Sequence, residues 1–326
     1  MTPVDIALAD VVVAYDRLRP HVRPTPMIRS AWLSARTGAD VHLKCENLQE
    51  TGSFKIRGAL SKLLTLTDAE RRAGVITASA GNHAQGVAWA SRLLGVSALV
   101  VVPAGTPAVK QAGIRRYGAE LTVAGDTYDA AADAARALQA ATGRTYVHAY
   151  LDPAVTAGQG TVALEALRRG DAWDLALVPA GGGGLIAGVG TVLKAVRPHV
   201  RIYGIQSEAS PPWVESFRVG RVVEVTYAPT LAEGLAGRID PENFDLVRRV
   251  TDEMLTVPEA AIGEAMAGLF REHRLVVEGS GAVGVAALLT GRVRPPAGSR
   301  VLVVLSGGNV DPERLLTLAS QAPSDP

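Results

Sequence analysis

Lys55 has clear chemical potential, because it is expected at the start of a helix, where a positive charge is unfavourable. It lies in the stretch "ETGSFKIRGAL", in which Ser53 is a good N-cap residue. Apolar residues then recur at helical spacing, at Ile56, Leu60, Leu63 and Leu64. The exposed N–H groups and the dipole of a first turn lower the pKa of a lysine amine, and a neutral amine condenses with aldehydes to form a Schiff base. The alternative is a lone lysine that reaches into solvent. The other candidate residues of the chain must distinguish between these two interpretations.

A run of glycines forms the second candidate site. The stretch "VPAGGGGLIAG", residues 178–188, is expected to follow a strand and to open a helix. Gly181, Gly182, Gly183 and Gly184 would let bare backbone N–H groups surround a phosphate at the helix N-terminus. A dinucleotide fingerprint is the alternative, since Glu208 ends the next strand where a ribose-binding acid would lie. Taken alone, the stretch does not separate the two interpretations.

Two polar turns complete the candidate set. In "SAGNHAQG", residues 79–86, Asn82 can donate to a phenolate oxygen, and the surrounding amides suit a carboxylate. In "LSGGN", Ser306 ends the last expected strand, and its hydroxyl can bond a pyridine nitrogen without a permanent charge. A plain helix cap and a turn serine are the alternatives. An aldehyde, a phosphate, a phenolate and a pyridine ring occur together in pyridoxal 5′-phosphate.

Composition indicates the class of protein that carries these residues. The chain has 326 residues, more than one core usually organises, and 33 basic against 32 acidic residues give a net charge of +1. We therefore expect two domains and a small-molecule partner, with no nucleic acid and no membrane partner. Cys45 is the single cysteine, and the start "MTPVDIALADVVVAYDRL" lacks a basic leader region. These features predict a cytoplasmic protein with Cys45 as a small buried strand residue.

The order of expected elements is that of an α/β fold. From residue 74 onward, short apolar strands alternate with Ala-rich helices. Strands are expected in "GVITAS", "SALVVVPAG", "LTVA", "DLALVPA", "RIYGIQ" and "RVLVVLSGG". A long helix over residues 152–170 is expected to carry the chain from one α/β unit to the other.

The motifs together resemble one enzyme family. The stretches "TGSFKIRGA", "ASAGNHAQGVA", "AGQGTVALE", "GGGGLIAG" and "LSGGN" occur in this order over most of the chain. They are similar to the fold type II pyridoxal-phosphate enzymes, in the branch of threonine/serine dehydratases (threonine ammonia-lyases) and serine racemases. The resemblance implies a tryptophan synthase β-like fold, with two three-layer α/β domains and the cofactor in the cleft between them. Residues 1–45 and 151–326 would form the large domain and residues 46–150 the small one.

The resemblance also implies roles for individual residues. Lys55 would form the Schiff base with pyridoxal 5′-phosphate, and Phe54 would pack against its ring. Asn82 would bond its phenolic oxygen, Gly181 to Leu185 its phosphate, and Ser306 its ring nitrogen. The substrate carboxylate would rest on the amides of the turn that contains Ser79, Ala80, Gly81 and His83. His83 itself is expected to serve packing or turn structure. A homodimer is implied by family likeness alone.

Departures from the family pattern narrow the expected reaction. In racemases of this branch a second serine acts as acid and base on the opposite face of the substrate, and here Ala80 takes its place. Gln206 and Pro212 stand where that branch has acidic metal ligands, so we expect no tight metal site. Tyr150 replaces a polar residue and is expected to shape the substrate pocket, while Glu278 is expected either to support the Asn82 turn or to cap a helix.

These observations predict a lyase of amino-acid metabolism. The expected reaction is dehydration and deamination of a β-hydroxy amino acid, L-threonine or L-serine, to a 2-oxo acid and ammonia. A serine racemase, or a dehydratase of hydroxyaspartate or aryl-serine, is the alternative on the same scaffold. A nicotinamide-dependent oxidoreductase built on residues 178–208 is a remote alternative, because it leaves Lys55, Asn82 and Ser306 without a role.

Overall fold

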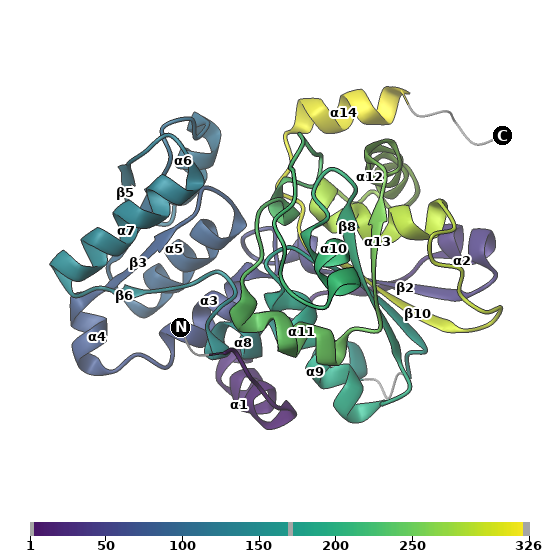
Figure 1. The fold of residues 1–326 in the computed structure, drawn as a ribbon, viewed down its shortest axis with the longest axis horizontal. Coiled ribbons are helices and arrows are strands. Elements are labelled where there is room, and N and C mark those ends of the chain that lie inside the picture. The colour runs from purple at the N-terminus through teal and green to yellow at the C-terminus, as the bar shows by residue number, and fades with distance from the viewer. Residues whose placement is uncertain (1–2, 169–171, 322–326) are drawn as a thin grey trace.

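Two β-sheets, mostly parallel and flanked by helices, organise the chain (Figure 1). The computed structural model describes residues 3–168 and 172–321. One sheet has six strands in the order β1-β2-β10-β7-β8-β9, and the other has four in the order β5-β4-β3-β6. Within the described residues, no helix is long and apolar enough to cross a membrane.

The strands are short, and their bounds follow the apolar runs of the sequence. They are β1 (Met27–Arg29), β2 (Asp40–Cys45), β3 (Val75–Ala78), β4 (Ala98–Val102), β5 (Glu120–Val123), β6 (Thr145–Tyr146), β7 (Leu175–Pro179), β8 (Arg201–Ser207), β9 (Glu253–Val257) and β10 (Arg300–Leu305). The helices are α1 (Leu8–Leu18), α2 (Ala31–Thr37), α3 (Lys55–Leu63), α4 (Asp68–Ala73), α5 (Asn82–Leu94), α6 (Ala108–Arg115), α7 (Tyr128–Thr142), α8 (Pro153–Leu167), α9 (Gly184–Val196), α10 (Pro212–Val219), α11 (Phe244–Val250), α12 (Glu259–His273), α13 (Gly279–Leu289) and α14 (Pro312–Gln321).

The six-stranded sheet joins segments from both ends of the chain. Strand β10 lies between β2 and β7 and is parallel to both, while β1 pairs antiparallel with β2 at the sheet edge. Its sequence RVLVVL is almost entirely apolar, as expected for a central parallel strand that is covered on both faces. The core confirms this arrangement, because Leu175 and Leu177 pack under α12 and α13, whereas Ala176 and Val178 pack under α8 and α9.

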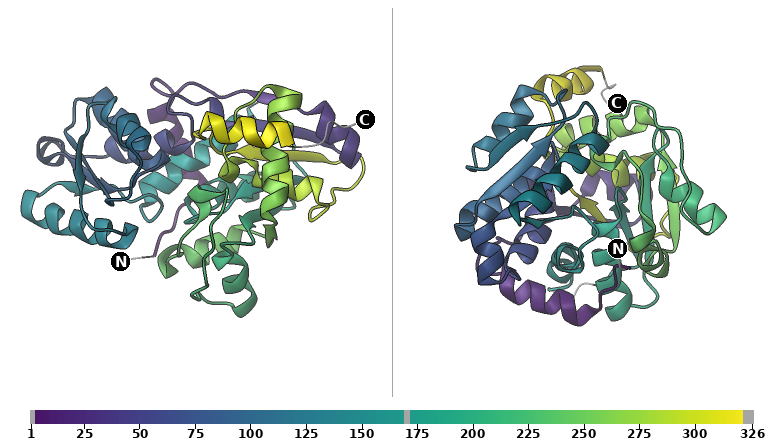
Figure 2. Two further views of the ribbon diagram at one scale, coloured as in Figure 1. Left: turned by 90° about the horizontal axis from the view of Figure 1, so that it is seen from above. Right: turned by 60° about the vertical axis from the view of Figure 1, so that its left-hand side comes forward.

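The four-stranded sheet is built in the same way from a continuous stretch of chain. Val100 and Val102 point to α3 and α5, whereas Leu99 and Val101 point to α7. Both sheets are therefore the middle layer of three, which confirms the predicted α/β fold. Helix α3 packs against both α5 and α8, so it lies between the two sheets (Figures 1 and 2).

The expected strands are present, and most expected helices agree in position. Helix α8 begins at Pro153 with Asp152 as its N-cap and ends at Leu167, while the end of the predicted range, residues 169–170, lies outside the described residues. Cys45 is buried at the end of β2, as predicted. The predicted cap of α3 was wrong. Phe54 occupies the N-cap position without a side-chain bond, and the buried Ser53 Oγ has no hydrogen-bond partner among the described residues.

Candidate active site

Lys55 is the first residue of α3, as its place in the sequence predicts. Its Nζ donates a long hydrogen bond of 3.3 Å to the carbonyl oxygen of Ala149. Burial lowers the pKa of the amine to about 8, and the carboxylate of Glu278 opposes that shift. The main cause is therefore desolvation rather than the helix dipole that the sequence argument emphasised. A larger fraction of this amine than of an ordinary lysine is therefore neutral, and so nucleophilic, near neutral pH.

Helix α3 is held in place by close contact with α8. A side chain at Gly158 would come within 2.5 Å of the Arg57 carbonyl oxygen, and one at Gly58 within 2.2 Å of Gln159 Nε2. Gln159 Oε1 accepts a 3.1 Å hydrogen bond from the Gly58 N–H, near the open end of α3. The small residues of "AGQGT" thus let α8 approach the helix that carries Lys55.

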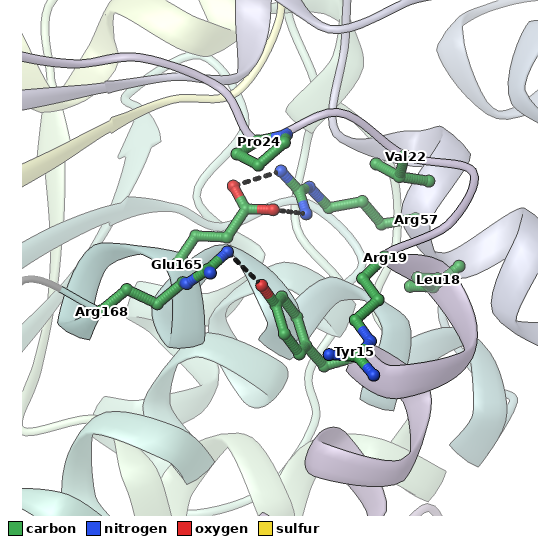
Figure 3. Close-up of a pocket in the computed structure, with 8 residues that line it drawn as sticks. All are labelled: Tyr15, Leu18, Arg19, Val22, Pro24, Arg57, Glu165 and Arg168. Atoms are coloured by element: carbon green, nitrogen blue, oxygen red, sulfur yellow. Dashed lines mark hydrogen bonds and ion pairs between the residues drawn. The ribbon is translucent and has the colours of Figure 1, made fainter.

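A buried cluster of charges fixes the same helix from another side. Arg57 Nε donates to Glu46 at 2.8 Å and Arg57 Nη1 donates to Glu165 at 2.8 Å, and all three side chains are almost completely buried. Lys44 Nζ donates to Glu165 at 2.6 Å, so two bases balance two acids. Figure 3 shows the pair formed by Arg57 and Glu165 at the wall of a cavity of about 250 Å³. Tyr15 and Arg168 also line that cavity, and none of the predicted site residues does.

The glycine loop joins β7 to α9 and has no room for side chains. Gly183 is the N-cap of α9 and has a φ of 93°, a left-handed conformation that favours glycine. A Cβ at Gly182 would lie 2.2 Å from the ring of Tyr150, and one at Gly184 would lie 3.0 Å from Tyr150 Cβ. The first N–H groups of α9 have no acceptor within their own helix. These N–H groups are therefore available to an anion, and the binding of a phosphate here stays a prediction.

Two residues that the sequence analysis missed hold the carbonyl groups of this loop. Trp213 Nε1 donates to the Gly181 oxygen at 2.5 Å, and Asn243 Nδ2 donates to the Gly182 oxygen at 2.6 Å. A Cβ at Gly183 would come within 2.7 Å of both of these side chains. These contacts satisfy the carbonyl oxygens of Gly181 and Gly182. Both donors come from remote segments and carry no local motif, so the sequence offered no signal for them.

The segment after β6 lies between the amine and the glycine loop. Its Ala149 oxygen accepts from Lys55, while the ring of the next residue, Tyr150, packs on Gly182 and Gly184. The Tyr150 hydroxyl donates to Asp240 Oδ2 at 2.6 Å, and burial raises the pKa of this phenol, so it stays protonated. Tyr150 is thus a fixed wall beside the loop, and its partner Asp240 was not foreseen.

The turn that contains Asn82 follows β3 and opens α5. Asn82 Nδ2 donates to Glu278 Oε1 at 2.7 Å. Glu278 occupies the N-cap position of α13 without making a side-chain cap bond, so of its two expected roles the structure supports contact with Asn82. The Ser79 N–H is bonded to the Val101 oxygen and is therefore not available for a carboxylate. The N–H groups in the first turn of α5 have no acceptor within the helix.

His83 fills a packing position, as expected. It is 3 % exposed, and its Nε2 lies 3.0 Å from the Val147 oxygen. A carbonyl only accepts, so Nε2 carries the proton, and burial lowers the pKa of the ring to about 3. The imidazole is therefore neutral at physiological pH.

Ser306 and Phe54 are brought together where β10 ends. The Phe54 N–H donates to the Ser306 carbonyl oxygen at 3.1 Å, and Ser53 pairs with Gly307 as an isolated β-bridge. Phe54 is buried, and the Lys55 amine lies 5.2 Å from the centre of its ring. Ser306 Oγ lies 3.5 Å from the Ser280 oxygen, at the limit of a hydrogen bond, which leaves the hydroxyl able to serve another partner.

Gln206 has a structural role in the position discussed for a metal. Its Nε2 donates to the Ala180 oxygen at 3.1 Å, and its Oε1 accepts from the Trp213 N–H at 2.9 Å. These bonds tie β8 to the glycine loop and to the start of α10. Within the described part of the chain, no group of three or more His, Cys, Asp or Glu side chains could hold a metal ion.

The strand ends and the glycine loop fit a phosphorylated cofactor, and comparison with known proteins identifies it. A family model described as "Pyridoxal-phosphate dependent enzyme" matches residues 18–307. The chain belongs to this family. The dinucleotide interpretation of the glycine stretch is thereby set aside, because the glycines of a pyridoxal-phosphate enzyme need only surround one phosphate.

Several relatives of this pyridoxal-phosphate enzyme are similar over nearly its whole length. The L-threonine ammonia-lyase of Thermotoga maritima is 43% identical over 307 residues, which are 94% of this chain and 76% of that protein. The crystal structure of a threonine deaminase from T.th. has a TM-score of 0.88 at 41% identity and covers 94% of this chain and 99% of its own. Maize serine racemase has a TM-score of 0.92 at 32% identity and covers 95% and 96%.

The residues present fit pyridoxal phosphate. Side chains at Gly182, Gly183 and Gly184 would strike their neighbours, and together with the start of α9 they leave a cradle of N–H groups for one phosphate. A chain of contacts connects this cradle through Tyr150 and Ala149 to the Lys55 amine. The neighbouring Phe54 connects the same amine to Ser306. An electrophilic aldehyde, a phosphate and a ring nitrogen would each find a suitable partner.

Proposed function

We propose that this enzyme is a lyase that removes water from a β-hydroxy amino acid, L-threonine or L-serine, and yields a 2-oxo acid and ammonia. The proposal rests above all on the position of Lys55. Its buried amine has a lowered pKa, and contacts through Ala149 and Tyr150 connect it to the glycine loop that would hold a phosphate. It is supported by the names of relatives, L-threonine ammonia-lyase and threonine deaminase. It is also supported by Ala80, which lacks the proton that racemisation requires on the second face.

Each residue of the proposed site then has one task. When bound, pyridoxal phosphate supplies an electron-withdrawing ring that acidifies the substrate Cα proton. Lys55 would hold the cofactor aldehyde through Nζ, and the same amine would accept the Cα proton of the substrate. Phe54 would pack on the ring of the cofactor, Asn82 would bind its phenolic oxygen, and Gly181 to Leu185 would hold its phosphate. The substrate carboxylate rests on amides of the turn from Ala80 to His83.

Ser306 favours elimination over a long-lived carbanion. Its hydroxyl would share a hydrogen bond with the ring nitrogen of the cofactor without placing a full charge beside it. The β-hydroxyl would leave as water with the proton that Lys55 Nζ accepts from Cα, so the step balances. The released enamine hydrolyses in water to the 2-oxo acid and ammonia, which accounts for every atom of substrate and water.

We further propose that Tyr150 limits the size of the β-substituent. Its ring lies against the glycine loop and its hydroxyl is fixed by Asp240, so it cannot easily move aside. A screen of threonine, serine, hydroxyaspartate and aryl-serine for 2-oxo acid formation, on the parent and on Tyr150→Ala, tests this. The parent should prefer the small substrates and the variant should gain on aryl-serine. An unchanged order of preference would contradict the role of Tyr150.

The experiment that tests the function is replacement of Lys55 by alanine. Loss of the amine should abolish both the visible absorbance of the bound cofactor and the conversion of threonine to a 2-oxo acid. Lys62→Ala is the matched control, because Lys62 lies on the same helix and is paired with Asp152 at 2.7 Å. Turnover or borohydride-trapped cofactor that survives in Lys55→Ala would remove this residue from its role.

The division of the chain and its assembly are proposals of the same standing. Residues 46–150 would be the small domain, which contains all four strands of one sheet, and residues 1–45 and 151–326 the large domain, which contains the other six. A homodimer is proposed from family likeness, and a cytoplasmic location from the single cysteine of the chain. Light scattering of the purified protein would contradict the dimer by giving the mass of a single 34.0 kDa chain.

A further inference from the structure

The side chain of Asn309 contacts Asn82, a contact to which the sequence analysis gave no role. Asn309 Nδ2 donates to the Thr51 carbonyl oxygen at 2.8 Å and to Asn82 Oδ1 at 2.7 Å. Gly52 provides the space, because it has a φ of 72° and a Cβ there would lie 2.6 Å from Asn309 Oδ1. The Gly308 N–H donates to the Gly52 oxygen at 2.8 Å, which ties the two loops together.

Glu278 contacts the other end of the Asn82 amide and, like Asn309, packs against a glycine. A Cβ at Gly307 would come within 2.3 Å of Glu278 Oε1, so a residue with a side chain would push this carboxylate away from Asn82. The Glu278 N–H donates to the Gly307 oxygen at 3.0 Å, which holds the backbone of the carboxylate in place. Both partners of Asn82 therefore sit against glycines.

These contacts decide which way round the Asn82 amide lies. A carbonyl oxygen only accepts, so the Asn309 atom that faces Thr51 must be the amide nitrogen. The same nitrogen faces Asn82, so the Asn82 atom beside it must be the oxygen. The Asn82 nitrogen is consequently on the opposite side, where one of its two hydrogens is donated to Glu278. The second hydrogen is left for an acceptor in the site.

We propose that Asn309 and Glu278 are positioning residues that orient the Asn82 amide so that its second N–H is presented to the phenolic oxygen of the cofactor. The inference rests on the proposed function, because it concerns the same site. If the amide turned over, an oxygen would face the cofactor oxygen, and an attractive contact would become a repulsive one. Neither positioning residue needs to touch the cofactor.

The test replaces the hydrogen-bond donor at position 309 by an acceptor in the holoenzyme. The Asn309→Asp variant has no N–H to donate to Thr51 or to Asn82, so the Asn82 amide is expected to turn and to donate to the new carboxylate. Loss of one hydrogen bond corresponds to about a tenfold change in equilibrium. The dissociation constant of pyridoxal phosphate should rise at least about tenfold in Asn309→Asp. The change should be smaller in Asn309→Ala, which removes the orienting contact without reversing it.

A control on the same loop separates orientation from charge. Asp311→Asn also changes one charge, but Asp311 accepts from the Glu313 N–H at 3.0 Å and serves the start of α14, so cofactor affinity should not change. Equal affinity and equal visible spectra in the parent, Asn309→Ala and Asn309→Asp would overturn the inference. If Asn309→Asp melts before it can be titrated, Asn309→Ala decides, since Asn309 is exposed and its truncation leaves no buried cavity.

The two proposals fail in different ways. A parent protein that binds no pyridoxal phosphate would defeat the proposed function itself. A parent that binds the cofactor and converts threonine, together with Asn309 variants that bind as tightly, would defeat only the orienting role. An affinity that falls in Asn309→Asp and in Glu278→Ala but not in Asp311→Asn supports the inference.

Discussion

The Lys55 amine gains its reactivity from where α3 places it. Burial moves its pKa down to about 8, although the nearby Glu278 carboxylate acts in the opposite direction. The same burial and an apolar neighbour, Phe54, keep the side chain in one place. Reactivity and position thus have a common cause, the enclosure of the first turn.

This pKa predicts the pH dependence of cofactor capture. In protein freed of cofactor, the neutral fraction of the amine falls about tenfold for each pH unit below 8, since only the uncharged form attacks an aldehyde. The rate at which visible absorbance appears after adding pyridoxal phosphate should therefore rise with pH and level off above about 8. A rate that keeps rising towards pH 10, as for free lysine, would show that the amine is not desolvated.

Because Ala80 has no proton to give, we expect no proton transfer on the substrate face opposite Lys55. The Ala80→Ser variant places a hydroxyl where the resemblance puts the second acid and base of racemases. We expect racemisation of L-serine to rise by at least about tenfold over the parent while dehydration persists, since one group can then act on each face. Chiral chromatography of the serine left after partial turnover measures this, and Ala80→Gly is the control. Identical D-serine formation in both variants would refute the argument.

The residue types that could be predicted from the sequence are those with a local signal. Lys55, Asn82, the glycine run and Ser306 each follow or precede a recognisable element. Trp213, Asn243 and Asp240 act through contacts with chain segments far away in sequence, so no spacing reveals them. Asn309 ends the quoted LSGGN stretch, but nothing local indicates its contact with Asn82. The N-cap of α3 failed for a similar reason, because pairing with Gly307 holds Ser53 outside the helix.

At the scale of elements, α3 depends on buried charges that balance each other. Arg57→Met leaves Glu46 and Glu165 without their main partner, and removing one member of a buried pair costs about 3–5 kcal/mol. We expect the free energy of unfolding to fall by about that amount in urea titrations. Arg168→Met is the control, as its partner Tyr15 is on the rim of the same cavity (Figure 3). A change there of under about 1 kcal/mol is expected.

The glycine loop makes a second prediction at this scale. Gly183→Ala must place a Cβ within 2.7 Å of Trp213 and Asn243 at a φ of 93°, so the loop must shift. Gly118→Ala is a matched control, because Gly118 has a φ of 82° but no atom within 4 Å of the new Cβ. Gly118→Ala should lose about 1 kcal/mol of stability from backbone strain, and Gly183→Ala should lose more, because its new Cβ also clashes with Trp213 and Asn243. Only Gly183→Ala should also weaken binding of pyridoxal phosphate, measured by absorbance titration.

The elements themselves were largely predictable because parallel strands leave a continuous apolar signature. β4, β7 and β10 are such runs. The pairing of β1 and β2 into the large sheet was not foreseen, since their sequences MIR and DVHLKC are short and mixed. Strand β9 was missed as well, and its EMLTV sequence is half-buried at a sheet edge.

At the scale of the whole molecule, helix α3 packs against helices of both sheets, and exposed ion pairs lie near the same boundary. Lys110 of α6 donates to Glu233 at 3.0 Å, and Arg314 of α14 donates to the same carboxylate at 3.0 Å. The first of these exposed pairs links a helix of the four-stranded sheet to the body of the six-stranded sheet, and the second lies within that body. The proposed site lies between them and α3, where both sheets contribute.

The central place of β10 predicts how the molecule responds to truncation. A chain that ends at Ser299 lacks the strand between β2 and β7 and also lacks Ser306, so the six-stranded sheet should not close. We expect amides in residues 75–147 to stay protected from hydrogen exchange while cofactor binding is lost. A chain that ends at Asp311 loses only α14 and is the control. Cofactor binding by the shorter chain would contradict this dependence.

Strand β10 also sets an order of events during synthesis. A ribosome has made nearly all of the sequence described above before this strand emerges, so β2 waits beside an open gap while the intervening four-stranded body can already mature. We therefore expect the nascent enzyme to be inactive until β10 and the residues after it leave the exit tunnel, because the apolar gap between β2 and β7 is unfilled. Chaperones that bind exposed apolar surface would act in that interval.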